Sequence, residues 1–114
     1  MVITIDRIPN LPDEEWRPIE GYGGKYLVSN HGRIKSLKHA NARLLTAFAN
    51  NKGYLRVCLC RNGQDRHFLV SRLVAAAFCE NDDPQTKTTI DHIDNDKMNN
   101  KASNLAWCSL KENV

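Results

Sequence analysis

The chain has 114 residues, of which 41% are hydrophobic and 25% are charged, and its formal net charge is +3. This length allows one domain with a modest core and excludes two independent domains, and the composition is globular rather than disordered. Residues 1–16 lack the pattern of a secretory signal, and the longest apolar run, residues 73–79, is too short to span a bilayer. We therefore expect a soluble, cytoplasmic protein that binds no membrane.

Positive charge is concentrated in the middle of the chain. Residues 21–72 contain ten basic side chains and one acidic side chain, whereas residues 1–20 and 73–114 each carry a net charge of −3. A polyanion such as DNA is attracted to such a segment even where the total charge is small. The alternative is a solvated basic face without a partner. The candidate DNA contacts are Arg33, Lys35, Lys38, Arg56 and Arg72.

Short antiparallel strands are predicted for the first half of the chain. Residues 26–29 and 33–37 flank an Asn-His-Gly turn and predict a hairpin with its basic side chains on one face. Residues 38–52 are irregular, with room for a short strand or a helical turn. Residues 54–60 and 65–70 flank an Asn-Gly turn and predict a second, more regular hairpin.

The second half combines helix and strand patterns. Apolar residues recur at helical spacing after Ser71, which we expect to be the N-cap of a helix. A strand that ends at His92, a polar loop over residues 93–103 and a second strand over 104–108 follow. Ser109 and the glutamate three residues later form a capping-box pattern, which predicts the start of another helix. The predicted fold class is α+β.

The four cysteines do not form a CxxC pair, which makes a shared zinc site the less favoured alternative. We expect reduced and mostly buried thiols. The residues concerned are Cys58, Cys60, Cys79 and Cys108.

The polar residues near the end of the chain suggest a metal site with a base beside it. Asp91 and His92 are adjacent at a strand end, so their side chains point to opposite faces. If the last helix packs across the strands, Asp91 and Asn113 can converge as oxygen ligands of a magnesium-like ion. His92 could then accept a proton from water near neutral pH. Asn104 begins the second strand and could clamp the loop through its side-chain amide.

This loop admits two other interpretations. A calcium-binding loop is excluded because Met98 and Leu105 occupy positions that require oxygen ligands. The second interpretation is a surface loop whose side chains bond to their own backbone turns, which we expect for Asn95, Asn99 and Asn100.

The same residues resemble a known family. "TIDHIDNDKMNNKASNLAWCSLKEN" resembles the HNH nuclease motif of phage and intron-encoded homing endonucleases, which runs Asp-His-Ile-Asp, Asn-Asn, Asn-Leu-x-Trp and Glu-Asn. Upstream, "SRLVAAAF" is similar to the helix that precedes this motif. "EEWRPIEGYGGKYLVSNHGRIKSL" resembles a small β module often fused to such nucleases. The resemblance covers about residues 15–113.

The resemblance implies roles for individual residues. His92 matches the general base that activates water against a phosphodiester. Asp91 and Asn113 match the ligands of a divalent metal, Mg²⁺ or Mn²⁺, which stabilises the transition state and the leaving oxygen. Asn104 matches the central asparagine of the catalytic set, which braces the loop.

The implied architecture is an N-terminal antiparallel β region, a linking helix and a C-terminal ββα-metal HNH motif. Residues 1–70 would form the basic, β-rich DNA-binding region, and residues 71–114 the helix and nuclease motif, in one compact unit. The implied activity is metal-dependent nicking or cleavage of DNA. The oligomeric state stays open, with a monomer favoured, and a phage-encoded enzyme would act in the host cell.

Two departures from the family pattern bear on these expectations. Ser71 stands where the family commonly has histidine, at a position outside the base and metal set. The sequence ends one residue after Asn113, which leads us to expect a weakly anchored ligand. One alternative function is therefore a DNA-binding protein with a truncated, weakly active HNH fold. A nuclease that acts on RNA, or on DNA without sequence preference, is another.

Overall fold

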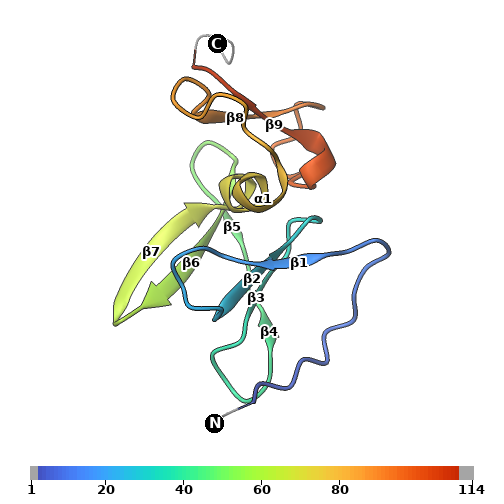
Figure 1. The fold of residues 1–114 in the computed structure, drawn as a ribbon, viewed down its shortest axis with the longest axis vertical. Helices are drawn as coiled ribbons and strands as arrows, with labels where there is room; N and C mark the ends of the chain where they lie inside the picture. Colours follow the sequence, from blue (N-terminus) through green and yellow to red (C-terminus); the bar gives the residue numbers. More distant parts are fainter. Residues whose placement is uncertain (1–2, 111–114) are drawn as a thin grey trace.

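The computed structural model describes residues 3–110 (Figure 1). Along the chain the elements are β1 (Trp16–Pro18), β2 (Tyr26–Ser29), β3 (Ile34–Ser36), β4 (Arg43–Leu44), β5 (Phe48–Ala49), β6 (Leu55–Arg61), β7 (Gln64–Leu69), α1 (Val70–Phe78), β8 (Thr89–His92), a 3₁₀ turn η1 (Ala102–Asn104) and β9 (Leu105–Cys108).

The strands form three antiparallel groups. One sheet has the order β1-β2-β3-β4, a second has the order β5-β6-β7, and β8 pairs with β9. Both predicted hairpins are confirmed, as β2–β3 and β6–β7. The second turns at Asn62 and Gly63, whose φ angles of 52° and 75° suit a tight hairpin turn. The described chain is thus sheet-rich with one α-helix, in agreement with the expected α+β class.

Helix α1 lies between the β8–β9 pair and the two larger sheets (Figure 1). Leu73 and Val74 point into a continuous core that also contains Val28, Leu59 and Leu105. Burying each such side chain stabilises the fold by about 1.5–3 kcal/mol. The helix therefore ties the C-terminal strand pair to the N-terminal sheets through shared apolar contacts.

The expected N-cap is wrong by two residues and in its mechanism. Leu69 is the N-cap and makes no side-chain cap, because β7 runs directly into α1. Ser71 is buried in the first turn of the helix rather than capping it. At the other end, the Arg17 guanidinium lies over the Phe78 ring and donates to the Ala77 carbonyl, so a residue of β1 satisfies an end of the helix.

Polar loops also join the two halves of the chain. The Ala102 N–H donates to the Asn30 carbonyl over 2.8 Å, and Lys97 Nζ donates to the Lys52 carbonyl over 2.9 Å. Gly32, at φ +87°, lies so close to residue 100 that a Cβ atom there would sit 3.2 Å from Asn100 Cβ. The turns of the N-terminal sheets thus pack directly against the loop of residues 93–101.

The cysteines differ from expectation. Cys108 is buried and Cys60 and Cys79 are half-buried, but Cys58 is exposed, so the expectation of mostly buried thiols is wrong. Residues 3–110 contain no group of three or more His, Cys, Asp or Glu side chains placed to hold a metal ion. Within the same range, no helix has the length and apolar character needed to cross a membrane.

Candidate active site

Strand β8 presents two adjacent candidate residues on opposite faces. His92 pairs with Leu105 of β9, and Asp91 pairs with Ala106. Alternation along the strand turns the His92 ring inward, where it is 6% exposed, and leaves Asp91 half-buried.

The His92 ring is held by a buried side chain of the following loop. Its Nε2 lies 2.8 Å from Asn100 Oδ1. A side-chain carbonyl oxygen can only accept, so Nε2 must carry the proton, and in the neutral ring Nδ1 then has a free lone pair. The Tyr54 ring packs 5.8 Å from the imidazole, centroid to centroid, at a tilt of 34°. The imidazole is therefore fixed by a hydrogen bond at one nitrogen and by an aromatic neighbour.

Asn104 clamps the loop as the sequence suggested. Its Oδ1 accepts the Asp94 N–H over 3.0 Å, and its Nδ2 donates to Asp94 Oδ1 and to the Asn99 carbonyl, each over 2.9 Å. The side chain is 8% exposed, so these bonds are shielded from water. The amide closes the loop back onto the start of β9.

Side chains of the loop bond to one another in a second layer. Asn99 Nδ2 donates to Asp94 Oδ2 over 2.9 Å, and this bond lowers the pKa of the Asp94 carboxyl, aided by the Asp96 N–H. The expectation that Asn99 satisfies the local turn holds, since its Oδ1 also accepts the Lys101 N–H. For Asn100 that expectation is wrong, because its side chain bonds to His92 instead.

Asp91 carries a carboxylate without a partner among the described residues. Its carboxylate makes no hydrogen bond or ion pair with any residue in 3–110, although it is half-buried. A hard, anionic oxygen donor without a protein cation beside it fits a divalent ion. Asn113, the second expected ligand, lies outside the described residues.

Arg33 and Lys35 are engaged inside the protein. Arg33 forms a two-pronged ion pair with Glu14, and Lys35 pairs with Asp6 while its ammonium group lies 4.0 Å from the centre of the Trp16 ring. The Arg33 guanidinium lowers the pKa of Glu14 from 4.5 to about 2. Lys35 is 3% exposed, so the two basic side chains are not presented together on a free face as expected.

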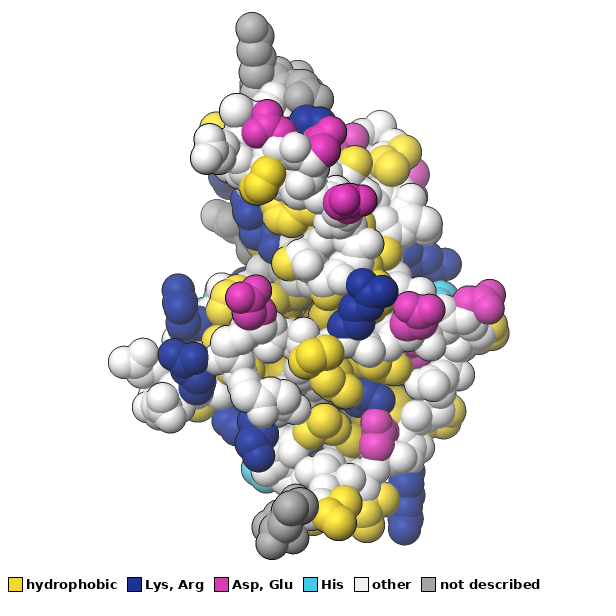
Figure 2. All heavy atoms as spheres, viewed as in Figure 1, with side chains coloured by type: hydrophobic (Ala, Val, Ile, Leu, Met, Phe, Trp, Pro, Cys, Tyr) yellow, Lys and Arg dark blue, Asp and Glu magenta, His cyan; other side chains and the backbone are white. Residues whose placement is uncertain are grey.

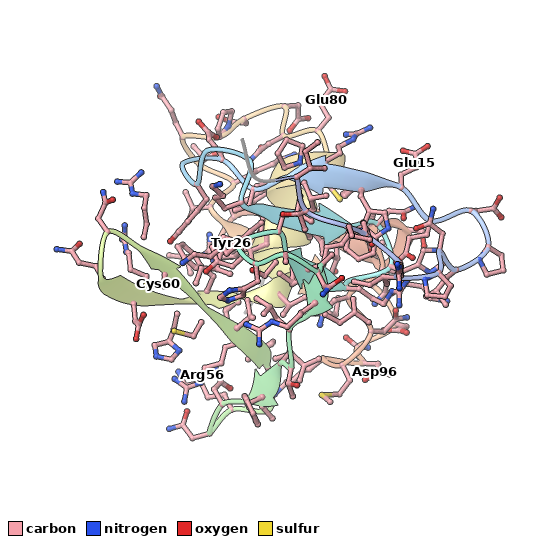
Figure 3. The ribbon with its side chains drawn as sticks, turned by 90° about the horizontal axis from the view of Figure 1, so that it is seen from below. Glu15, Tyr26, Arg56, Cys60, Glu80 and Asp96 are labelled. Atoms are coloured by element: carbon pink, nitrogen blue, oxygen red, sulfur yellow. The ribbon has the colours of Figure 1, made fainter. Side chains whose placement is uncertain are left out.

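The other three candidate DNA contacts reach solvent. Lys38, Arg56 and Arg72 are all exposed, and Arg56 points outward from the β5–β6 pair in Figure 3. Arg72 also donates to the Thr88 carbonyl over 2.7 Å. In Figure 2, Lys and Arg side chains gather over the β6–β7 side of the molecule, while Asp and Glu side chains cluster near β8 at the top.

Sequence reasoning missed Asn100 and Tyr54 as neighbours of His92. The Asn-Asn pair in the motif was a signal for Asn100, but its contact with His92 depends on how the loop folds. Tyr54 comes from a turn 38 positions before His92 in the chain, and local patterning carries no signal for such a pair.

Comparisons with known proteins agree with this geometry. The NUMOD4 motif matches residues 14–60. The DNA endonuclease I-HmuI of Bacillus phage SP01 is 40% identical over 100 residues, which cover 88% of this chain and 55% of that protein. A solved structure described as DNA binding and cleavage by the HNH homing endonuclease I-HmuI superposes with a TM-score of 0.79, over 88% of this chain and 55% of that one.

The chain is thus similar in sequence and in structure to an HNH homing endonuclease. Two further relatives are named HNH endonucleases. The HNH endonuclease L247 of Acanthamoeba polyphaga mimivirus, named as uncharacterized, is 39% identical over 89% of this chain and 25% of its own length. The H-N-H endonuclease F-TflII of Escherichia phage T5 is 30% identical over 71% of this chain and 41% of its own length. This chain thus spans about half or less of the relatives it matches.

Proposed function

We propose that this chain is a metal-dependent endonuclease that nicks or cleaves DNA, with His92 as the general base. The observation that carries the proposal is the 2.8 Å contact between His92 Nε2 and Asn100 Oδ1, which favours a proton on Nε2 and leaves Nδ1 as the acceptor nitrogen. The similarity to I-HmuI, whose solved structure is one of DNA binding and cleavage, supports the choice of substrate.

In the proposed reaction, His92 Nδ1 accepts a proton from a water molecule as that water attacks the phosphorus. The positive charge that develops on the ring is stabilised at Nε2–H by the side-chain oxygen Oδ1 of Asn100. General-base catalysis of this kind contributes about 10²–10⁴-fold in rate. Asn104 has a positioning role and no part in proton transfer, because its hydrogen bonds fix the loop that carries Asn100.

Asp91 is the proposed metal ligand, together with Asn113. When bound there, a divalent ion supplies charge neutralisation to the phosphate and to the departing oxygen. The half-buried Asp91 carboxylate fits this role because no cation of the described chain neutralises it.

We assign the DNA contacts of the basic region to Lys38, Arg56 and Arg72 and give Arg33 and Lys35 a structural role. Exposed cations can displace the counterions of the phosphate backbone, whereas a buried ammonium that already has a carboxylate partner cannot do so without breaking its pair. Relatives from two phages support a setting in the cytoplasm of an infected cell. We propose that the chain acts there as a monomer.

The decisive test is incubation of purified protein with supercoiled plasmid in Mg²⁺, in Mn²⁺ and in excess chelator. We expect conversion to open-circular or linear DNA in the presence of metal and none with chelator. DNA retention without cleavage in either metal would instead identify a binding protein with an inactive HNH fold. Equal cleavage in chelator would remove the metal from the mechanism.

The proposed ligand can be tested separately from cleavage. Asp91→Ala should weaken Mn²⁺ binding in a calorimetric titration and leave the metal-free fold intact, because a ligand carboxylate is stabilised chiefly by its cation. The control is Asp96→Ala, which removes an exposed carboxylate of the loop after β8. If Asp91→Ala binds Mn²⁺ like the parent and Asp96→Ala does not, the ion belongs to the loop instead.

A further inference from the structure

The buried Asn100 amide beside the proposed base uses its oxygen in a hydrogen bond but not its nitrogen. Asn100 is 5% exposed, its Oδ1 meets His92 Nε2, and its Nδ2 has no hydrogen-bond partner among the described residues. An unpaired buried donor is costly, so such a group in a native protein calls for an explanation. The cost is explained if this orientation of the amide is kept because it places an acceptor oxygen against His92 Nε2.

A second observation shows how residue 100 itself is held in position. Gly32 packs against the backbone and Cβ of Asn100. A Cβ atom added at residue 32 would lie 3.2 Å from Asn100 Cβ and 3.2 Å from the Asn100 carbonyl oxygen. The neighbouring Asn30 carbonyl accepts the Ala102 N–H, which fixes the chain on the other side of Asn100. Asn30 is itself fixed, since its Oδ1 accepts the Glu15 N–H over 2.8 Å. The β2–β3 turn thus packs directly against Asn100 and restricts its position.

We propose that Asn100 is a positioning residue that holds His92 in the Nε2–H tautomer, and that the β2–β3 turn at Gly32 sets the position of Asn100. The N-terminal β region is then part of the nuclease site and not solely a surface for DNA. This inference rests on the proposed role of His92, but the tautomer of the ring can be measured without any cleavage.

The two orientations of the Asn100 amide predict opposite tautomers. With Oδ1 toward the ring, Nε2 carries the proton and Nδ1 is free. With Nδ2 toward the ring, Nε2 must accept and the proton moves to Nδ1, which cannot then act as a base. Nitrogen-15 NMR of the imidazole distinguishes these forms at about pH 8, above the ordinary imidazole pKa of about 6.5.

The first experiment measures the His92 tautomer in the metal-free protein, with the signal assigned by its loss in His92→Gln. We expect the Nε2–H form in the parent and in Asn100→Asp, which keeps the acceptor oxygen. Asn100→Leu, which has the same branched arrangement of side-chain heavy atoms but no acceptor, should give a mixture of tautomers and cut plasmid nicking by about 10–100-fold. A parent in the Nδ1–H form, or an unchanged tautomer in Asn100→Leu, overturns the proposal.

Tyr26→Phe controls for the general loss of side-chain hydrogen bonds made by a buried residue. Tyr26 Oη accepts the Cys60 N–H over 3.0 Å and donates to the Cys60 carbonyl over 3.3 Å, away from the β8–β9 pair. We expect this variant to lower the thermal midpoint while keeping the His92 tautomer and the nicking rate. If Tyr26→Phe and Asn100→Leu shift the tautomer and the rate alike, Asn100 has no specific role.

The second experiment tests the turn with a pair of glycines. Gly32→Ala and Gly63→Ala both place a side chain at positive φ, +87° and +75°. The Cβ of Gly32→Ala would press on Asn100, whereas a Cβ at residue 63 would meet no atom within 4 Å beyond its chain neighbours. We expect Gly32→Ala to disturb the His92 signal and reduce nicking, with Gly63→Ala close to the parent in both. Equal effects would show backbone strain alone and overturn the role of the turn.

If His92→Gln cleaves like the parent while Asn100 still governs the tautomer, the proposed function fails and the positioning contact stands. If His92→Gln is inactive while Asn100→Leu leaves the tautomer unchanged, the function stands and the positioning role fails. The two inferences are therefore separable.

Discussion

Two polar clusters of this protein are held together by different kinds of interaction. The ion-pair cluster consists of Asp6, Glu14, Arg33 and Lys35 around Trp16, and each charge in it meets an opposite charge. The amide cluster consists of Asp94, Asn99, Asn100 and Asn104, and it is held by side-chain amides. The first cluster uses its charges to join the N-terminal segment to the sheet. The second holds a loop in place, and the neighbouring Asp91 carboxylate and His92 Nδ1 have no hydrogen-bond partner among residues 3–110.

This difference shows that net charge along a sequence is a poor guide to which charges are available. Arg33 and Lys35 lie in the most basic part of the chain, yet both are neutralised internally. Asp91, in a net-acidic part, is a carboxylate that no residue in 3–110 pairs with. Availability for chemistry depends on the partner that each group has already found in the fold.

The largest expected effect is at His92, which contacts Asn100 of the amide cluster. His92→Ala and His92→Gln should both lower the nicking rate by about 10²–10⁴-fold, since neither side chain is a base. Only His92→Ala should also lower stability, by about 1–3 kcal/mol, because it leaves the Asn100 oxygen without a donor, whereas glutamine can donate. Plasmid nicking and urea unfolding measure the two effects. Retained nicking in His92→Gln would remove His92 from the mechanism.

The next effect belongs to the ion-pair cluster. The pKa of Glu14 is lowered from 4.5 to about 2, chiefly by Arg33 and also by bonds from Leu11 and Ser29, which corresponds to about 3 kcal/mol of stability. Because the folded-state pKa is the lower one, this contribution is present above pH 4.5 and is lost as the pH falls toward 2. Glu14→Gln should be less stable than the parent at about pH 7, and the difference in urea unfolding should shrink as the carboxylate is protonated.

The exposed Glu15 carboxylate provides the matched control for Glu14. Glu15 lies 3.8 Å from Arg17, with both side chains more than half exposed. Glu15→Gln should change the unfolding curve little at any pH, because water screens such a pair. Similar losses in both variants would mean that burial of the Glu14–Arg33 pair has no special weight.

The smallest expected effect concerns DNA binding. Replacing Lys38 and Arg56 with alanine should weaken binding and reduce the slope of log affinity against log salt by about two, one for each phosphate contact. Lys35→Met should leave that slope unchanged, because Lys35 is buried against Asp6. Fluorescence anisotropy at several salt concentrations measures both. A slope that changes with Lys35→Met alone would restore the sequence-based assignment.

Features that depend on neighbours along the chain could be predicted, and features that depend on distant partners could not. The β6–β7 hairpin follows from alternation around an Asn-Gly turn, and the strands around the loop follow from the same kind of pattern. The clamp by Asn104 was predictable because it acts on the loop that precedes it. The burial of Lys35 was not, since its partner Asp6 is 29 residues away. The contact of Asn100 with His92 was missed for a related reason, because its geometry is set by a turn near residue 32.

The bond from Ala102 N–H to the Asn30 carbonyl has a consequence for how such chains can be recombined. A chimera that takes residues 1–70 from one relative and the rest from another would keep this joint only if the backbone paths of the turn and of the loop match. The turn at 30–32 and the loop at 100–102 would therefore need to be transferred as a pair. Exchange of the β module between family members is thus constrained by a few backbone atoms and not by the chain connection alone.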